Sequence, residues 1–523
     1  MIDPKGRDPR GCSEISDRGL LAHFRWPRFL NLLPIVFLVN ACNHSEDPSE
    51  LTRWGLPADL VNYQRQLEVL RLPEAVDRLD WLQRNRRLRT LIATKTSISN
   101  LQGLPDTLSS LDVSHTPILS LKGLPKSVSF LNIIGTNVSD LRSLPPSLTH
   151  LAMDGSQIGR LENGRLPESL LDLNLTDTDL SELDWLPSKL ESFSLSDSSL
   201  EAISLPPSLV SLRLTNVSIN NPRSSAFPLT FPRGLQSFEL DFGTDSREGA
   251  QEQVSLEDLP AMLERLSVDY SDYPDISRLR YLKFLKITRY DLNFPTAAKN
   301  LLELQVNNPS DPTMLIKQFK MLRRQFGKLP ALRAFAILNG GKIDFANLPK
   351  RLISLNVAGC KNTDLRNVPS DLIDLNISWC DIQNLRGLPP HLQTLDISNA
   401  TKLKTLNDLR SEHLTTLVAR WTALEEISTL PKSLKVLDLT GSAIKSMTAF
   451  LPNLEALSVS QTALQTLPNL PDTVAYLDIS NSNIKAIGAL PKNLVTLRVG
   501  PSQLVSLQGL PPSVRVLEFC DQK

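Results

Sequence analysis

Thiols and imidazoles are the side chains most able to act as nucleophiles or metal ligands, and in this sequence they are few and scattered. No CxxC or HExxH spacing occurs, so the sequence predicts neither a metal site nor a disulfide framework. It also has no P-loop, GxSxG or paired-carboxylate motif, so we expect no catalytic residues, no cofactor and no enzymatic activity. The cysteines are Cys12, Cys42, Cys360, Cys380 and Cys520, and the histidines are His23, His44, His115, His150, His391 and His413.

Two tryptophans are the strongest candidates for a binding site. Trp379 and Trp421 occupy the same phase of a repeated sequence unit, with Asn399 between them. Exposed tryptophan is enriched in binding hot spots, and strands about 4.8 Å apart would place the two rings about 10 Å apart on one surface. The alternative is that each ring packs on the turn of its neighbouring repeat. Further candidate binding residues, all polar, are Asn376, Asp396 and Asp438.

The repeated unit that positions these residues is about twenty residues long and covers most of residues 88–519. A typical copy reads LPxSLxxLxLxxTxIxxLxG, and Leu104-Pro105, Leu124-Pro125 and Leu144-Pro145 open three successive copies. The central LxL, as in Leu111-Asp112-Val113, alternates apolar and polar residues as a short strand does. The unit resembles a leucine-rich repeat. This resemblance implies stacked strands in one parallel sheet.

We therefore predict a mainly β repeat solenoid, a leucine-rich-repeat horseshoe with a concave parallel sheet. The unit is short for this class, and the proline removes a backbone donor, so the convex side should hold extended segments rather than helices. The turn after each strand usually carries a small residue, such as Thr116 or Thr462, whose hydroxyl can bond a buried backbone group. Cys360 and Cys380 take this position as predicted packing residues; the alternative is a reactive or metal-binding pair.

Polar residues recur at the outward position of the LxL strands and should line the concave face. Because Asp and Asn are poor strand residues, their recurrence could reflect side-chain ladders, solubility or a ligand. The residues at this position include Asp112, Asn132, Asn174, Arg213, Asn356, Asn376, Asp396, Asp438 and Asp478.

The chain divides into six segments. Residues 51–87 contain two amphipathic stretches, 60–70 and 75–82, which we interpret as a helical N-terminal cap. Residues 220–330 keep candidate strands but lose the spacing, and 312–328 has the apolar pattern of one helix. The inserts there could form a binding face or be simple drift. The full division is 1–41 signal peptide region, 42–50 polar tether, 51–87 cap, 88–219 regular repeats, 220–330 irregular repeats and 331–523 regular repeats.

The last repeat shows no cap, because the sequence stops near Leu517-Glu518-Phe519, inside a predicted strand. An open strand edge can pair with another chain. We therefore expect weak self-association through this C-terminal edge strand.

The N-terminal region has the features of an export signal. The apolar run over residues 29–41 is too short for a membrane-spanning helix, which needs roughly 20 residues, but suits a signal peptide. Val39-Asn40-Ala41-Cys42 resembles a bacterial lipobox, which implies a lipid on Cys42 and a membrane anchor. Since Asn43 is not Asp, the resemblance implies an outer-membrane lipoprotein. A plain signal peptide and a buried apolar helix are the alternatives.

The charge balance and the repeat bear on function. Lys+Arg and Asp+Glu both number 56, so the chain is neutral and we expect no nucleic-acid partner. The Leu-Pro unit resembles the repeat of leucine-rich effectors of bacterial type III secretion, whose solenoids bind host proteins. Some of these have a ligase domain with a CxD cysteine, a spacing that Cys520-Asp521-Gln522 lacks. We expect an envelope lipoprotein whose concave face binds a protein or glycan; the alternative is a secreted effector that binds a host protein.

Overall fold

The computed structural model describes residues 48–520, and the predicted signal peptide and Cys42 lie outside this range. Helix α1 (Pro48–Arg53) includes residues 48–50, which the sequence assigned to the polar tether. Within the range, the positions not described are 55, 58–59, 61–65, 155–165, 178–181, 201, 220–228, 242–258, 270–277, 289–297, 308–323, 325, 340, 410, 450, 468, 485–489 and 501–508.

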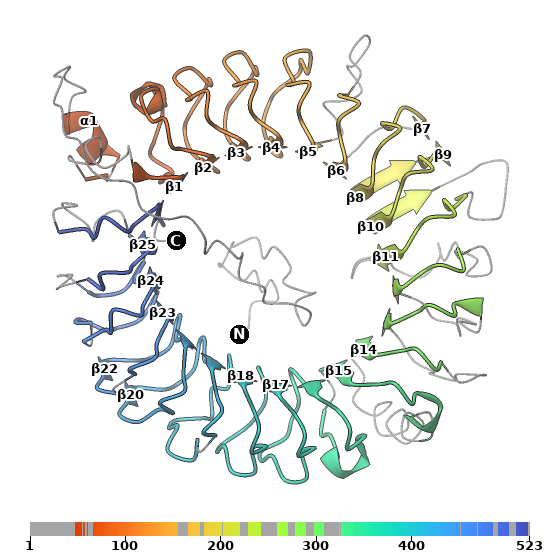
Figure 1. Cartoon of the computed structure of the whole chain (residues 1–523), viewed down its shortest axis with the longest axis vertical. Coiled ribbons are helices and arrows are strands. Elements are labelled where there is room, and N and C mark those ends of the chain that lie inside the picture. The colour runs from red at the N-terminus through yellow and green to blue at the C-terminus, as the bar shows by residue number, and fades with distance from the viewer. Residues whose placement is uncertain are drawn as a thin grey trace, which may run out of the picture.

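The chain forms a ring lined on its inner side by one parallel sheet of 22 strands (Figure 1). The first half of the sheet comprises β1 (Val69–Arg71), β2 (Thr90–Ile92), β3 (Ser110–Asp112), β4 (Phe130–Asn132), β5 (His150–Asp154), β6 (Asp172–Thr176), β8 (Ser192–Leu200), β10 (Ser211–Ile219), β11 (Ser237–Asp241), β12 (Arg265–Asp269) and β13 (Phe284–Thr288). The second half comprises β14 (Glu303–Asn307), β15 (Ala334–Leu338), β16 (Ser354–Asn356), β17 (Asp374–Asn376), β18 (Thr394–Asp396), β19 (Thr416–Val418), β21 (Val436–Asp438), β23 (Ala456–Ser458), β24 (Tyr476–Asp478), β25 (Thr496–Val499) and β26 (Val516–Phe519).

The outer side consists mainly of extended connections, as predicted from the short unit and its proline. Four short strands form two small sheets there, β7 (Glu182–Leu183) with β9 (Ala202–Ile203) and β20 (Glu426–Ile427) with β22 (Ser446–Met447). Three 3-10 turns, η2 (Asp80–Leu82), η6 (Phe326–Lys328) and η7 (Phe345–Asn347), are also described. In the described part of the chain, no helix is long and apolar enough to cross a membrane.

The core is a continuous column of aliphatic side chains between the strands and the outer connections. Strand pairing sets Leu111 beside Leu131 and Leu131 beside Leu151, and all three are buried. The predicted hydroxyl bonds follow each strand: Thr116 Oγ1 donates to Val113 O at 2.6 Å, and the same bond recurs at Thr136, Thr422, Thr462 and Ser482. These bonds satisfy carbonyl groups inside the column, which would otherwise be costly to bury.

The ring closes where the first and last strands of the sheet meet. Val69, Leu70 and Arg71 of β1 pair in parallel with Val516, Leu517 and Glu518 of β26. The prediction of an open C-terminal strand edge is therefore wrong, because β1 fills it. The self-association predicted from that edge loses its premise.

The N-terminal region differs from the predicted helical cap. Strand β1 occupies residues 69–71, at the end of the first predicted helix, and residues 61–65 lie outside the described residues. Residues 75–82 form no α-helix: a turn at Ala75 is followed by irregular backbone and the 3-10 turn η2. Strand β1 adds to the sheet before β2 and pairs with β26 on its other side. The first strand therefore leaves no open edge that a helical cap would need to cover.

The irregular middle keeps its predicted strands. Strands β11 to β14 coincide with the four candidate strands of residues 220–330 and join the sheet in register. Most of the helix predicted over 312–328 lies outside the described residues, and the described end is the 3-10 turn η6. The long insert at 242–258 is also outside them.

Cys360 and Cys380 are joined in a single disulfide, which the sequence analysis did not predict. The two residues hold the same turn position in adjacent repeats, and this places their Cα atoms 4.7 Å apart, within the range a disulfide spans. Both are buried, so the predicted packing role is confirmed.

Candidate functional site

The two candidate tryptophans lie on one edge of the ring, and both are exposed. The exposed fraction is 67% for Trp379 and 47% for Trp421. They follow β17 and β19, which flank β18, so Asn399 lies between them. Two strand spacings separate the tryptophan positions by about 10 Å. We call Trp379, Asn399 and Trp421 the tryptophan rim.

All three rim residues have a left-handed backbone, with φ of 60°, 57° and 55°. In the next repeats the equivalent position holds Gly441, Gln461 and Asn481, of which Gly and Asn adopt this conformation readily. A bulky side chain with positive φ costs about 1–2 kcal/mol. Tryptophan at these positions therefore lowers the stability of the fold, so stability does not explain why it is present.

Backbone bonds between repeats hold the rim in this conformation. The N–H of Trp379 donates to Ser398 O at 2.7 Å, that of Asn399 to Arg420 O at 2.7 Å and that of Trp421 to Thr440 O at 2.8 Å. Strained residues persist where the surrounding structure over-determines them, and such positions cluster at functional sites.

The Trp421 side chain lies against the following repeat. The six-membered ring of Trp421 lies in the space that a Cβ on Gly441 would occupy. Two other repeats show the same arrangement, with His115 against Gly135 and Asn339 against Gly359. One face of the Trp421 ring is therefore supported by protein, in line with the alternative that the rings pack on neighbouring turns. Nearly half of the side chain stays exposed, so packing and binding are compatible at this position.

The polar candidates on the inner face have a shared structural role. The Oδ1 atoms of Asn376, Asp396 and Asp438 each accept the backbone N–H two residues later, from Ser378, Ser398 and Thr440 at 2.9–3.0 Å. Asp112, Asn132, Asn356 and Asp478 make the same bond. These bonds explain why Asp and Asn recur in the strands, because the side chain closes each turn.

The remaining side-chain atoms of these candidates connect adjacent repeats. Asn376 Nδ2 donates to Asp396 Oδ2 at 3.3 Å, and Arg420 Nε donates to Asp438 Oδ2 at 2.6 Å. Burial raises the pKa of Asp396 above its ordinary value, while bonds from Ser398 and the charge of Arg420 act in the opposite direction. The sequence predicted the aspartates but missed Arg420. Only the register of the repeats shows that Arg420 reaches Asp438 of the next repeat.

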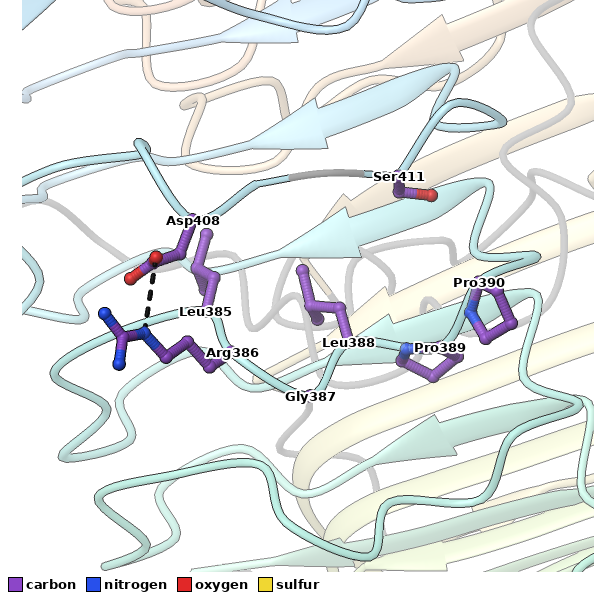
Figure 2. Close-up of a pocket in the computed structure, with 8 residues that line it drawn as sticks. All are labelled: Leu385, Arg386, Gly387, Leu388, Pro389, Pro390, Asp408 and Ser411. Carbon is purple, nitrogen blue, oxygen red and sulfur yellow. Dashed lines mark hydrogen bonds and ion pairs between the residues drawn. The ribbon is translucent and has the colours of Figure 1, made fainter.

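A pocket of about 440 Å³ lies elsewhere, between the outer connections of two adjacent repeats (Figure 2). Arg386 and Asp408 form an ion pair at one end, and Pro389, Pro390 and Ser411 line the other. The second repeat has no Leu-Pro step equivalent to Leu388-Pro389. Its lining includes no tryptophan and no metal-binding cluster, and we do not assign it to the binding site.

Within the described residues, no three His, Cys, Asp or Glu side chains are grouped as metal ligands. The disulfide between Cys360 and Cys380 was also missed from the sequence, although their shared phase in adjacent repeats was the signal for it. Cys42, the predicted lipidation site, lies outside the described part of the chain.

No protein-family model matches this sequence, and no curated protein matches it either. Solved structures do show a likeness. YopM from Yersinia enterocolitica WA-314 is 22% identical over 88% of this chain and 96% of that chain, with a TM-score of 0.35. The functional domain of InlJ from Listeria monocytogenes, which includes a cysteine ladder, is 18% identical over 75% and 69% of the two chains, with a TM-score of 0.28.

A mouse protein complex, RP105/MD-1, is 14% identical over 82% of this chain and 81% of that chain, with a TM-score of 0.39. At these scores no ligand or role is inferred from the likenesses. The assignment of the chain as a leucine-rich-repeat solenoid follows from its own repeats and from the parallel sheet that they form.

Proposed function

We propose that this chain is a non-enzymatic scaffold that recognises a partner protein through the tryptophan rim. The observation that carries the proposal is that two exposed tryptophans occupy left-handed positions where neighbouring repeats have Gly or Asn. Indole side chains are enriched in binding hot spots because they bury a large area with little loss of conformational entropy. The backbone bonds to the next repeat fix the rim in advance, which lowers the entropic cost of binding.

The test compares partner capture by the wild-type chain and by the Trp379→Ala/Trp421→Ala variant. We expect the variant to lose the captured proteins while its thermal unfolding changes little, because alanine keeps the Cβ that is strained at positive φ. Leu119→Ala is the matched control, because Leu119 is 65% exposed but belongs to a different repeat. Capture of the same proteins by the tryptophan variant would contradict the proposal, and capture of glycans alone would replace the protein partner by a carbohydrate.

We further propose that the scaffold is displayed on a bacterial envelope through a lipid on Cys42. The apolar run before Cys42 supports this, and so does the disulfide between Cys360 and Cys380, because disulfides persist mainly in oxidising compartments. Intact mass of the protein from its native host should reveal a chain that begins at Cys42 and carries acyl groups, and Cys42→Ser should abolish both changes. An uncleaved, unlipidated chain found in the medium would favour the secreted effector instead.

A further inference from the structure

The inner face of the ring is acidic although the whole chain is neutral. On the described strands of the large sheet, the side chains that alternate with the buried ones include eleven carboxylates and five cations. The carboxylates are Asp112, Asp154, Asp172, Glu239, Asp241, Glu303, Asp374, Asp396, Asp438, Asp478 and Glu518, and the cations are Arg71, Arg213, Arg265, Lys286 and Arg498.

The cations of this face are engaged away from β17 and β18. Arg71 and Arg498 lie 3.6 Å and 2.9 Å from Glu518, and Arg498 also contacts Asp478 at 3.0 Å. Arg213 and Lys286 both pair with Glu239. Arg265 lies over the ring of Phe284 at 4.0 Å. The excess of negative charge therefore falls on other strands, including the two beside the tryptophan rim.

Asp374 and Asp396 carry this excess on β17 and β18. Asp374 is hydrogen-bonded to Thr394, and Asp396 to Ser398 and Asn376, all of which are neutral. Arg420, which also acts on Asp396, is bonded to Asp438 at 2.6 Å. Both carboxylates are on strands adjacent in the sheet: Asp374 begins β17, the strand before Trp379, and Asp396 ends β18, the strand before Asn399.

Burial raises the pKa of Asp374, of Asp396 and of three other carboxylates on this face, Asp154, Glu303 and Asp478. A raised carboxylate pKa means that the ionised form is poorly stabilised by its surroundings. A cation brought to these side chains would supply the missing stabilisation.

The lumen is wide enough for a polypeptide. Twenty-two strands spaced by about 4.8 Å enclose a ring about 34 Å across between backbones, and inward side chains of about 5 Å on each side leave about 24 Å. An α-helix with its side chains is about 10–12 Å wide. A ring of this width can therefore admit a helix or an extended segment along one arc of the face.

We propose that the arc of the inner face formed by β17, β18 and β19 binds a lysine- or arginine-rich segment of the partner protein, with Asp374 and Asp396 as the anionic contacts. The inference rests on the proposed function and names the chemistry of the partner. The tryptophan rim borders the same arc, and indole faces attract Lys and Arg through cation–π interactions. Charge complementarity of this kind selects partners and raises association rates.

The test uses a lysine homopolymer as the probe and a glutamate homopolymer as its counterpart, with binding measured by titration calorimetry on the full chain. We expect binding of the lysine polymer only, weakened by added salt. The Asp374→Asn/Asp396→Asn variant should bind about tenfold more weakly, since a difference of about 1.4 kcal/mol is tenfold in affinity. The variant should keep the fold. Asn376 of the preceding repeat already occupies the strand position equivalent to Asp396.

Glu425→Gln/Asp472→Asn is the matched control, since both residues are exposed carboxylates outside the large sheet. It should leave affinity within about twofold of wild type.

Carbodiimide coupling of the lysine polymer to the chain, read by mass spectrometry, should label Asp374 and Asp396. Equal affinity of both polymers, wild-type affinity of the Asp374→Asn/Asp396→Asn variant, or coupling to outer carboxylates alone would overturn the proposal. Partner capture by Trp379→Ala/Trp421→Ala and by Asp374→Asn/Asp396→Asn separates the two proposals. If the tryptophan variant loses the partner and the Asn variant keeps it, the rim remains the binding site and the proposal of a basic segment on the inner face is overturned.

Discussion

The six-membered ring of Trp421 lies against Gly441 of the next repeat, in space that any larger residue at 441 would need. A Cβ built on Gly441 would clash with Trp421 Cδ2. Gly441 also has a φ of 68°, which favours glycine. The two residues, one repeat apart in the sequence, therefore act as a pair: the glycine makes room for the exposed ring and supports one of its faces.

Gly441→Ala should displace the Trp421 ring and lower the free energy of unfolding by about 1–2 kcal/mol, because alanine is strained at positive φ. Partner binding should weaken together with stability. Chemical denaturation followed by tryptophan fluorescence measures the first effect, and calorimetry measures the second. Gly234→Ala is the control, since a Cβ there meets nothing within 4 Å. Unchanged fluorescence and affinity in Gly441→Ala would show that the contact does not position Trp421.

Trp379→Asn should stabilise the fold by about 1 kcal/mol while it weakens partner binding, because Asn tolerates the left-handed backbone that strains tryptophan. Asn399 holds the same position in the next repeat with a φ of 57°. Thermal unfolding followed by circular dichroism measures the gain. A variant that is both less stable and fully competent in binding would mean that Trp379 serves the fold.

Thr462→Val should cost about 1 kcal/mol, because it removes the 2.7 Å bond from Thr462 Oγ1 to Val459 O and keeps the shape of the side chain. Thr462→Ser, which retains the hydroxyl, should lose less. Urea denaturation of the two variants compares them. If serine and valine are equally destabilising, lost packing and not the hydrogen bond dominates at this position.

Asp396→Asn should raise the unfolding temperature at pH 7, and this gain should shrink as the pH falls toward 4. Burial raises the pKa of Asp396 in the folded protein above its ordinary value of 3.8. The folded state then holds the proton more tightly than the unfolded chain, so stability is greatest below the unfolded pKa and is lost as pH rises through the folded pKa. Asn cannot ionise and still offers an oxygen to the N–H of Ser398. Melting curves at pH 7 and pH 4 measure the gain. An equal gain at both pH values would show that ionisation of Asp396 is not its cause.

Glu518→Gln should weaken the closure of the ring, because Glu518 forms ion pairs with Arg498 of the preceding repeat and with Arg71 across the β1–β26 pair. We expect a cost of about 1–2 kcal/mol, below that of a fully buried ion pair, since Arg498 is partly exposed. Small-angle scattering should show a larger radius of gyration. Glu425→Gln is the control, because its ion pair with Lys445 is exposed and should contribute little. An unchanged scattering profile would show that backbone pairing and Leu517 close the ring without Glu518.

Sequence reasoning was most successful where physics is local. The period of two in Leu111-Asp112-Val113 placed each leucine in the core and each polar residue on the inner face, and the small residue at Thr116 correctly predicted a buried hydroxyl bond. Even the loosened middle kept its strands, because Phe238 and Leu266 obey the same alternation.

Sequence reasoning failed where the outcome depends on contacts between distant repeats. The helical interpretation of residues 60–70 and 75–82 used apolar spacing alone, and β26 supplied a strand partner that short-range patterns cannot contain. The disulfide between Cys360 and Cys380 required the register of two strands, which the spacing of twenty residues suggested but did not establish.

The sequence by itself determined the repeat, the identity of the buried and inward residues, the extended outer connections and the two tryptophans in equal phase. The tertiary structure decided that these tryptophans have a left-handed backbone, that Trp421 lies on Gly441, and that the ring closes. Closure over 22 strands needs a rotation of about 16° per strand, and an error of a few degrees in each would leave an open horseshoe. Such small rotations come from the packing of whole repeats against one another, and for this reason local sequence patterns do not reveal them.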